Sequence, residues 1–442
     1  MLARSTLSPQ VALTTQSKTE KDMKHYESWG RSDLAFLLIM LATLLLASGA
    51  GAQSKYKTLH SFTGGGADEQ PLAGLIFDSA GNLYGTTSGG DHGTGTVFKL
   101  TPNSDGSWTE NVLYDFGGGG APQAGLIFDA DGNLYSTTYD GGPTGLGTVF
   151  KLTRNSDGTW AESVLYSFCS RSNCVDGRSV YAGVIFDHAG NLYGTTWLGG
   201  AGGQGTVFKL TRHSNGSWTE SVIHSFDGRD GANPGASLIF DLTGNLYGTT
   251  YMGGSSGMGV VFQLAPKSDG TWKESVIHSF GGMDGALPYA SLVFDQSGNL
   301  YGTTTSGGGC NVGGSGCGVV FQLTPNADGR WKEKVLHRFT AAPDGAFPWT
   351  GLSFDHSGNL YGTAAGGGDP THCSDYFFGC GVVFKLTPNL KGGWRETVLH
   401  QFRDHPGAKP FGGLIFDTAG NLYGTTNGDD TTTFGSVFEI TP

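Results

Sequence analysis

The sequence predicts an all-β fold, a seven-bladed β-propeller of four-stranded blades in which the N-terminal strand closes the last blade. Three observations lead to this prediction. A near-copy of the phrase Phe-Asp-x-x-Gly-Asn-Leu-Tyr-Gly-Thr-Thr occurs seven times in the 442 residues, and each repeat contains four strand-like runs. The last repeat lacks one run, which the N-terminal region supplies. A repeat period of about 50 residues is typical of propellers and other repeat architectures.

The repeated phrase predicts a tight turn between two strands. Its opening aspartate can cap the turn through its carboxylate, and its glycine supplies the positive φ that a hairpin needs. In the second copy, Asp129-Ala130-Asp131-Gly132-Asn133 resembles the opening of a calcium loop. The other copies lack the second aspartate and no bidentate glutamate follows at the required offset, which favours the turn. The central glycines are 51 to 62 residues apart: Gly81, Gly132, Gly190, Gly244, Gly298, Gly358 and Gly420.

The four runs of each repeat have the composition of strands. In the fourth copy they span 236–241, 245–250, 259–264 and 272–280, are rich in aromatic and β-branched residues, and end at Gly, Asn, Asp or Pro. Several are apolar at consecutive positions, as in Leu238-Ile239-Phe240. This pattern is typical of strands that are buried on both faces, as in a blade packed between two others.

The two ends of the repeat region predict how the ring closes. The last copy stops at Val437-Phe438-Glu439-Ile440, without a fourth strand. The missing strand matches residues 58–62, Thr58-Leu59-His60-Ser61-Phe62, which resemble residues 222–226. We therefore expect residues 53–442 to form a single propeller, with its edges hidden by closure.

Residues 1–52 are predicted to be a secretory signal peptide with a long leader. An apolar run at 34–47, broken only by Thr43, follows Lys24 and Arg31 and precedes Ala50-Gly51-Ala52, after which we expect cleavage. Met23 is an alternative start. An uncleaved anchor is the alternative interpretation, although the run is short for a membrane span. The mature protein is therefore expected to be secreted or periplasmic and to have no stable membrane span.

The six cysteines form three close pairs in loops rich in Gly or Ser. In an exported chain this spacing predicts the disulfides Cys169–Cys174, Cys310–Cys317 and Cys373–Cys380. Metal binding is the alternative, but Cys-x4-Cys and Cys-x6-Cys spacings without paired histidines favour it little.

The repeat phrase, together with partners such as Gly95-Thr96-Val97-Phe98-Lys99-Leu100 and Trp-x-Glu, resembles the Gloeobacter/Verrucomicrobium-type (GloVer) tandem repeat over residues 56–442. The resemblance implies an exported bacterial repeat protein, and it brings no catalytic residues to transfer. The Asp-x-x-Gly-Asn-Leu-Tyr part also resembles the blade openings of NHL-type propellers, which bears on the fold alone.

One face of the predicted propeller carries uniform turns, while the other carries variable loops and all three cysteine pairs. Binding residues concentrate on variable loops of a rigid scaffold. Two loop positions on this face are rich in aromatic residues, which hold sugars and dominate protein interfaces; packing against neighbouring blades is the alternative. The candidate ligand-binding residues are Tyr139, Trp197 and Tyr251 after the Thr-Thr pair, and Tyr181, Tyr289, Trp349 and Phe411 before the first strand.

Two further recurring sets are expected to be structural. Histidines recur at one position of the fourth strand, where we expect hydrogen bonds on the outer strand: His60, His224, His278, His337 and His400. Aspartates recur before glycine in the fourth-to-first loops, where turn capping is favoured over a cation site at the channel mouth: Asp176, Asp230, Asp284 and Asp344.

Composition and motifs favour a binding module over an enzyme. The net charge of -12 and the lack of a basic run in the repeats argue against nucleic acid. No nucleophile elbow, His-Glu-x-x-His or phosphate loop occurs, so we expect no catalytic residue, cofactor or metal. The prediction is a monomeric, exported propeller that binds a glycan or an envelope protein through its irregular loop face. The alternatives are a polysaccharide hydrolase or lyase with a site in the central channel, and a structural envelope protein without a discrete ligand.

Overall fold

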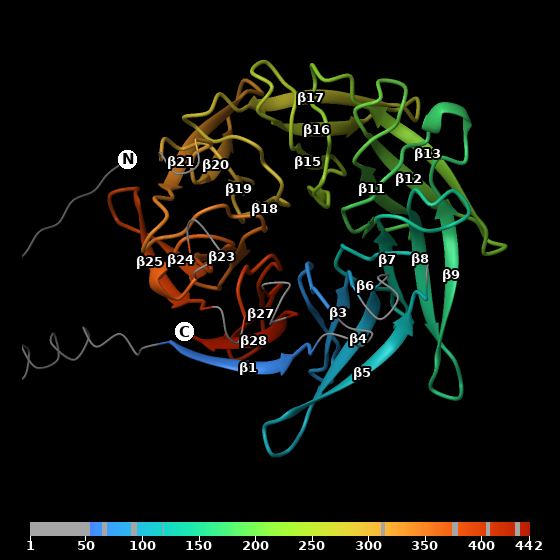
Figure 1. The fold of residues 1–442 in the computed structure, drawn as a ribbon. Coiled ribbons are helices and arrows are strands. Elements are labelled where there is room, and N and C mark those ends of the chain that lie inside the picture. Colours follow the sequence, from blue (N-terminus) through green and yellow to red (C-terminus); the bar gives the residue numbers. More distant parts are fainter. Residues whose placement is uncertain are drawn as a thin grey trace, which may run out of the picture. The chain divides into compact units, whose positions relative to one another are not determined.

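The computed structural model describes residues 54–63, 69–89, 95–117, 119–310, 314–373, 379–403, 407–428 and 434–442. They belong to one compact unit, residues 54–442, which forms a ring of seven four-stranded antiparallel sheets (Figure 1). The predicted seven-bladed propeller is therefore confirmed. The predicted signal peptide lies outside the described residues. No helix within the described ranges is long and apolar enough to cross a membrane.

Each blade is an antiparallel meander with a two-residue inner strand and an outer strand of seven or eight residues. The first blade contains β2 (Ile76–Phe77), β3 (Leu83–Thr87), β4 (Thr96–Pro102) and β5 (Trp108–Asp115). The second contains β6 (Ile127–Phe128), β7 (Leu134–Thr138), β8 (Thr148–Arg154) and β9 (Trp160–Ser167). The third contains β10 (Ile185–Phe186), β11 (Leu192–Thr196), β12 (Thr206–Arg212) and β13 (Trp218–Ser225).

The remaining blades repeat this pattern around the ring. The fourth contains β14 (Ile239–Phe240), β15 (Leu246–Thr250), β16 (Val260–Pro266) and β17 (Trp272–Ser279). The fifth contains β18 (Val293–Phe294), β19 (Leu300–Thr304), β20 (Val319–Pro325) and β21 (Trp331–Arg338). The sixth contains β22 (Ser353–Phe354), β23 (Leu360–Ala364), β24 (Val382–Pro388) and β25 (Trp394–Gln401). Two single-turn 3-10 helices, η1 (Ser172–Cys174) and η2 (Pro370–His372), lie in loops.

The seventh blade is closed by the N-terminal strand, as predicted. Its sheet has the order β1-β28-β27-β26, with β1 (Lys55–Ser61), β26 (Ile415–Phe416), β27 (Leu422–Thr426) and β28 (Ser436–Thr441). Lys55 pairs with Thr441 and Ser61 with Ser436. The strand begins before the predicted residue 58 because the ladder continues to the end of β28. In Figure 1 the blue β1 lies beside the red β28 and joins the two ends of the repeat region.

The inner strands are shorter than predicted. The expected strand at 236–241 is paired only at Ile239 and Phe240, which face Tyr247 and Leu246. The preceding residues line the central channel, and the carbonyl of Ala236 accepts a hydrogen bond from Thr195 of the previous blade at 3.3 Å. These backbone groups therefore bond to the neighbouring blade instead of extending the ladder.

The first of the last two positions of the phrase is a threonine in all seven copies and joins each blade to the next; the second position is Ala364 in the sixth copy and a threonine in the others. The hydroxyl of the first threonine donates to a backbone carbonyl in the inner segment of the following blade, at 2.9 to 3.4 Å, in all seven copies. The last of these bonds, from Thr425 to Ala73, crosses from the seventh blade to the first. Part of the repeated phrase thus closes the ring.

The aspartate of the phrase organises the turn, as expected. In the fourth blade, one Asp241 oxygen accepts from the Thr243 and Asn245 amides, and the other accepts from the Asn245 side chain and the Tyr247 hydroxyl. Burial alone would raise the pKa of Asp241, but hydrogen bonds, chiefly from Asn245 and Thr243, hold it below its usual value. The Asp129 carboxylate makes the same contacts to Asp131, Asn133 and Tyr135. These hydrogen bonds within the turn explain why an aspartate stands at this position.

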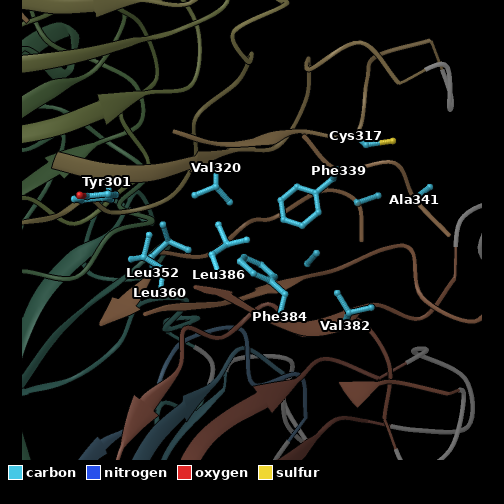
Figure 2. Close-up of a cluster of buried hydrophobic side chains, with 12 residues drawn as sticks. Tyr301, Cys317, Val320, Phe339, Ala341, Leu352, Leu360, Val382, Phe384 and Leu386 are labelled. Atoms are coloured by element: carbon cyan, nitrogen blue, oxygen red, sulfur yellow. The ribbon is translucent and has the colours of Figure 1, made fainter. Parts of the chain in front are cut away.

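The core lies between neighbouring blades. Figure 2 shows one such cluster, in which Tyr301 from β19 and Phe384 and Leu386 from β24 come together with Phe339 from the intervening connection. In six of the seven copies a glycine follows the tyrosine of the phrase and leaves room for this packing, while the second copy has the buried Ser136 there. A Cβ on Gly248 would lie 2.7 Å from the Phe262 ring and 2.8 Å from Leu238, closer than real contacts allow.

The outer strands of neighbouring blades meet at a recurring cluster of ionisable groups. His224 contacts Asp230 at 2.8 Å, and Glu274 of the next blade lies beside this pair. Burial, as the main cause, raises the pKa of Glu274 to about 7. Burial likewise raises the pKa of Glu333 and of Glu396 to about 7, beside Asp284 and Asp344 respectively.

The recurring histidines are structural, as expected. His278 and His337 contact Asp284 and Asp344 at 3.0 and 3.1 Å, and His60 contacts Glu110 at 3.1 Å. At the closing blade Tyr56 occupies the position of the glutamate. The Tyr56 ring stacks on the His400 ring, with the ring centroids 4.0 Å apart and an angle of 6° between the ring planes.

Candidate functional site

The antiparallel meander divides the connections between two faces of the ring. The second-to-third and fourth-to-first connections form one face, which we call the loop face. All three predicted disulfides form on it: Cys169–Cys174, Cys310–Cys317 and Cys373–Cys380. Disulfides are typical of proteins that mature outside the reducing cytoplasm. The loop face is therefore covalently braced within three of its connections.

The first disulfide holds a loop that neutralises a buried carboxylate. Arg171, between the two cysteines, contacts Glu220 of the next blade at 2.8 Å, and the Glu220 side chain is fully buried. Burial, as the main cause, raises the pKa of Glu220 to about 7; Asp176 also raises it, while Arg171 lowers it. The Asp176 carboxylate accepts from the Tyr166 hydroxyl and the Ser170 amide, each at 2.8 Å.

The other loop aspartates cap turns in the same way, as expected. Asp230, Asp284 and Asp344 accept backbone amides of their own loops and contact the histidines of the outer strands. None of the four recurring aspartates is among the described residues that line the channel or its mouth.

Removal of the Arg171 charge should destabilise the protein through Glu220. Arg171→Met leaves a buried carboxylate without its partner and should cost about 2 to 4 kcal/mol at pH 8. Urea unfolding measures this loss, and the added change Glu220→Gln should recover most of it. Arg330→Met is the matched control, because its pair with Asp328 is exposed and should contribute under about 1 kcal/mol. Equal losses in the two arginine variants would contradict this role.

Four of the seven candidate aromatic residues surround the mouth of the channel on the loop face. Together with Leu72 and Gln123 they line a cavity of about 240 Å³. We call these six residues the mouth ring: Leu72, Gln123, Tyr181, Tyr289, Trp349 and Phe411. They come from six blades, from the position just before each inner strand. None of the six described residues that line this cavity carries a charge.

The remaining three candidates, Tyr139, Trp197 and Tyr251, form an outer arc that packs against the mouth ring. Tyr139 contacts Tyr181 at 4.5 Å between ring centroids, and Trp197 contacts both Tyr181 and Tyr289, at 5.2 and 5.9 Å. Tyr251 contacts Trp197 at 5.5 Å and Tyr289 at 6.0 Å. The outer arc therefore buttresses the mouth ring and does not line the cavity.

The contacts continue through the mouth ring. Tyr289 lies 6.5 Å from Tyr181 and 5.0 Å from Trp349, and Trp349 lies 6.0 Å from Phe411. All seven candidate residues thus belong to one connected cluster, which draws on six of the seven blades.

A glycine makes room for this cluster. Gly235 occupies the mouth position of the fourth blade, where the other blades have larger side chains. A Cβ there would lie 2.9 Å from the Trp197 ring and 3.0 Å from the Tyr289 ring. The two rings can therefore approach the fourth blade only because residue 235 has no side chain.

Below the mouth ring, the channel is lined by small residues. The channel cavity of about 360 Å³ is bounded by the six residues of the mouth ring and by inner segments such as Ala124-Gly125 and Ala236-Ser237. The described lining includes no Asp, Glu, His, Lys or Arg. Burial raises the pKa of Tyr289 and of Tyr181, so both hydroxyls stay neutral at physiological pH. Within the described ranges, no group of three or more His, Cys, Asp or Glu side chains is placed to hold a metal ion.

The sequence predicted the aromatic residues at the position before each inner strand as binding residues, but not Leu72, Gln123 and Gly235 at the same position. The signal was present, because all seven residues occupy equivalent places before the inner strands. Their position at the mouth follows from the ring geometry, and a Gln, a Leu or a Gly in one copy carries no chemical signal by itself.

A search of curated proteins finds no match to this chain. A family model described as the Gloeobacter/Verrucomicrobia repeat matches residues 49–239, 159–329 and 244–442. These overlapping matches cover the whole ring, so the chain belongs to the Gloeobacter/Verrucomicrobia repeat family.

Proposed function

We propose that this member of the repeat family is an exported binding module, which holds a group of a carbohydrate or of a protein in the mouth ring. The main support for this proposal is that seven aromatic residues, which the repeat itself does not require, come together at the mouth of the channel. At the same two positions other copies have Ser88, Thr305, Ala365, Asn427 and Gly235. The fold therefore tolerates small or polar residues at these positions. Folding alone does not explain why aromatic residues from six blades are in contact here, whereas ligand binding does.

The physical properties of the mouth ring suit binding. Its side chains are only partly buried, so they keep surface available to a ligand. Partly exposed Trp and Tyr side chains supply much of the binding energy at protein interfaces, and their rings pack on apolar surfaces of ligands. The three disulfides and the predicted signal peptide support an extracellular or periplasmic location for this activity.

Substitutions in the mouth ring should abolish binding and leave the fold intact. Screening the exported protein on arrays of polysaccharide fragments and of peptides gives the ligand. Tyr289→Ala with Trp349→Ala should then weaken its binding at least tenfold, as expected for central aromatic residues. The triple variant Tyr139→Ala, Trp197→Ala, Tyr251→Ala should weaken it as well, because the mouth ring loses its support.

Met283→Ala is the control, because Met283 is 65% exposed on the loop face and is not part of the mouth ring. Circular dichroism should show an unchanged spectrum for every variant. Wild-type affinity in the Tyr289, Trp349 variant would count against the mouth ring as the binding site.

A further inference from the structure

The mouth ring points to one chemical class of ligand, and this inference rests on the part of the proposed function that makes the mouth ring a binding site. We propose that the mouth ring is an aromatic cage for a methylated ammonium group, such as the trimethylammonium of choline. The group enters from the loop face and is held by the rings of Tyr181, Tyr289, Trp349 and Phe411.

The aromatic side chains enclose the cavity on several sides. Neighbouring rings of the mouth ring meet at steep angles: 72° between Tyr181 and Tyr289, 71° between Tyr289 and Trp349, and 79° between Trp349 and Phe411. Rings at such angles can surround one compact group from several sides, as the aromatic rings of quaternary-ammonium sites do. The cavity of about 240 Å³ is bounded on its remaining side by Leu72 and Gln123.

The cavity offers few side-chain hydrogen-bond partners. A buried hydroxyl or amine without a partner costs free energy, so a sugar needs several polar groups around it. Among the side chains of the six described lining residues, Gln123 supplies the only amide, and the other polar side-chain groups are the hydroxyls of Tyr181 and Tyr289 and the indole N–H of Trp349. A tetra-substituted nitrogen has no N–H to satisfy, so the enclosure accommodates it without an unpaired donor.

The charge around the cavity also favours a cation. A cation within about 6 Å of an aromatic ring is attracted by the π face, most strongly by Trp, and more so when water is displaced. No lysine or arginine is found among the described residues that line the cavity or the channel below it. The chain as a whole carries a net charge of -12, which favours the approach of cations over anions.

The test compares choline with its uncharged carbon isostere. In titration calorimetry on the exported protein, choline should bind at least about tenfold more tightly than 3,3-dimethylbutan-1-ol, because the two molecules have the same shape and differ in charge. Tetramethylammonium should bind as well. Ammonium should bind more weakly than tetramethylammonium. Trp349→Ala should abolish choline binding, Trp349→Phe should retain part of it, and Met283→Ala should leave it unchanged.

A second binding experiment, with lipid vesicles, identifies the source of the methylated ammonium group. Binding to phosphatidylcholine vesicles that choline chloride displaces identifies a lipid headgroup, and binding to free choline alone identifies a soluble ligand. Both outcomes support the cage. Equal binding of the isostere, or choline binding that survives Trp349→Ala, overturns it. If an uncharged array ligand binds in a Trp349-dependent way while choline does not, the cage is wrong and the proposed function stands; if no ligand depends on Trp349, both fail.

Discussion

Deletion of residues 53–62 is expected to lower the melting temperature sharply and to cause aggregation, because the last blade loses the strand that closes it. These residues include β1, whose Leu59, together with Phe62, is buried against the last and first blades. Phe62 contacts Phe98 of the first blade at 5.3 Å, and β28 loses its only outer neighbour. Loss of two large buried side chains and a whole strand should exceed roughly 5 kcal/mol, comparable with the total stability of many domains. Thermal unfolding and light scattering would show a much lower melting temperature and aggregation.

A peptide of residues 54–62 added in trans should restore the melting transition, because it can pair with the free edge of β28. The same peptide with Leu59 and Phe62 replaced by serine is the control and should not restore it. A deletion variant that unfolds cooperatively at the wild-type temperature would show that the ring does not need this closure.

Replacement of Glu274, Glu333 and Glu396 by glutamine is expected to stabilise the protein at pH 8. Burial raises the pKa of each carboxyl to about 7, from a usual value near 4.5. A carboxyl with a raised pKa in the folded state favours folding while it is protonated. That contribution is complete below about pH 4.5 and is lost as the pH rises through about 7.

The gain at pH 8 should be on the order of 1 to 2 kcal/mol per glutamate, after allowance for solvent screening of partly exposed carboxyls. The neighbouring groups that act on these carboxyls are His224, Asp230 and Asp227 for Glu274, Asp284 and Arg338 for Glu333, and Asp344 and His337 for Glu396. The contribution of His400 to stability has the opposite pH dependence. Burial lowers the pKa of His400 from about 6.5 to about 4. The neutral imidazole therefore stabilises the folded state above about pH 6.5, and this contribution is lost as the pH falls through about 4.

The measurement is the difference in free energy of unfolding between the triple variant and the wild type, from pH 4 to pH 8.5. The difference should be near zero at about pH 4, grow as the pH rises above about 4.5 and level off above about pH 7. Asp131→Asn is the control, since Asp131 is exposed, and should give a flat difference. A flat difference in the triple variant as well would show that these carboxyls titrate normally.

Much of the fold could be predicted because each local signal is repeated seven times. The Asp-x-x-Gly-Asn turn is specified by its own side chain, since Asp241 bonds only to residues within six positions along the chain. The missing last strand follows from counting, and β1 pairs with β28 as that count predicts. The three disulfides follow from close spacing, because five or seven residues can bring two cysteines together within one loop.

The predicted length of the inner strands was wrong, because an apolar run does not show which hydrogen-bond partners its backbone groups will have. The carbonyl of Ala236 bonds to Thr195, 41 residues earlier, and this pairing depends on how two blades meet. The role of the phrase's threonines in joining blades was missed for the same reason. Their hydroxyls reach the next blade, and no local pattern encodes that distance.

The sequence by itself determined the architecture of this protein: seven blades, their turns, the closing strand and the braced loops. These features depend on local chemistry and on repetition, which a linear pattern displays in full. Only the tertiary structure decided which of the aromatic residues line a common space. Tyr181 and Phe411 are 230 positions apart in the chain, yet both line the 240 Å³ cavity, while Trp197 lies behind the mouth ring over Gly235. Closure of the ring brings equivalent positions of all blades around one axis, and this convergence turns scattered substitutions into a site.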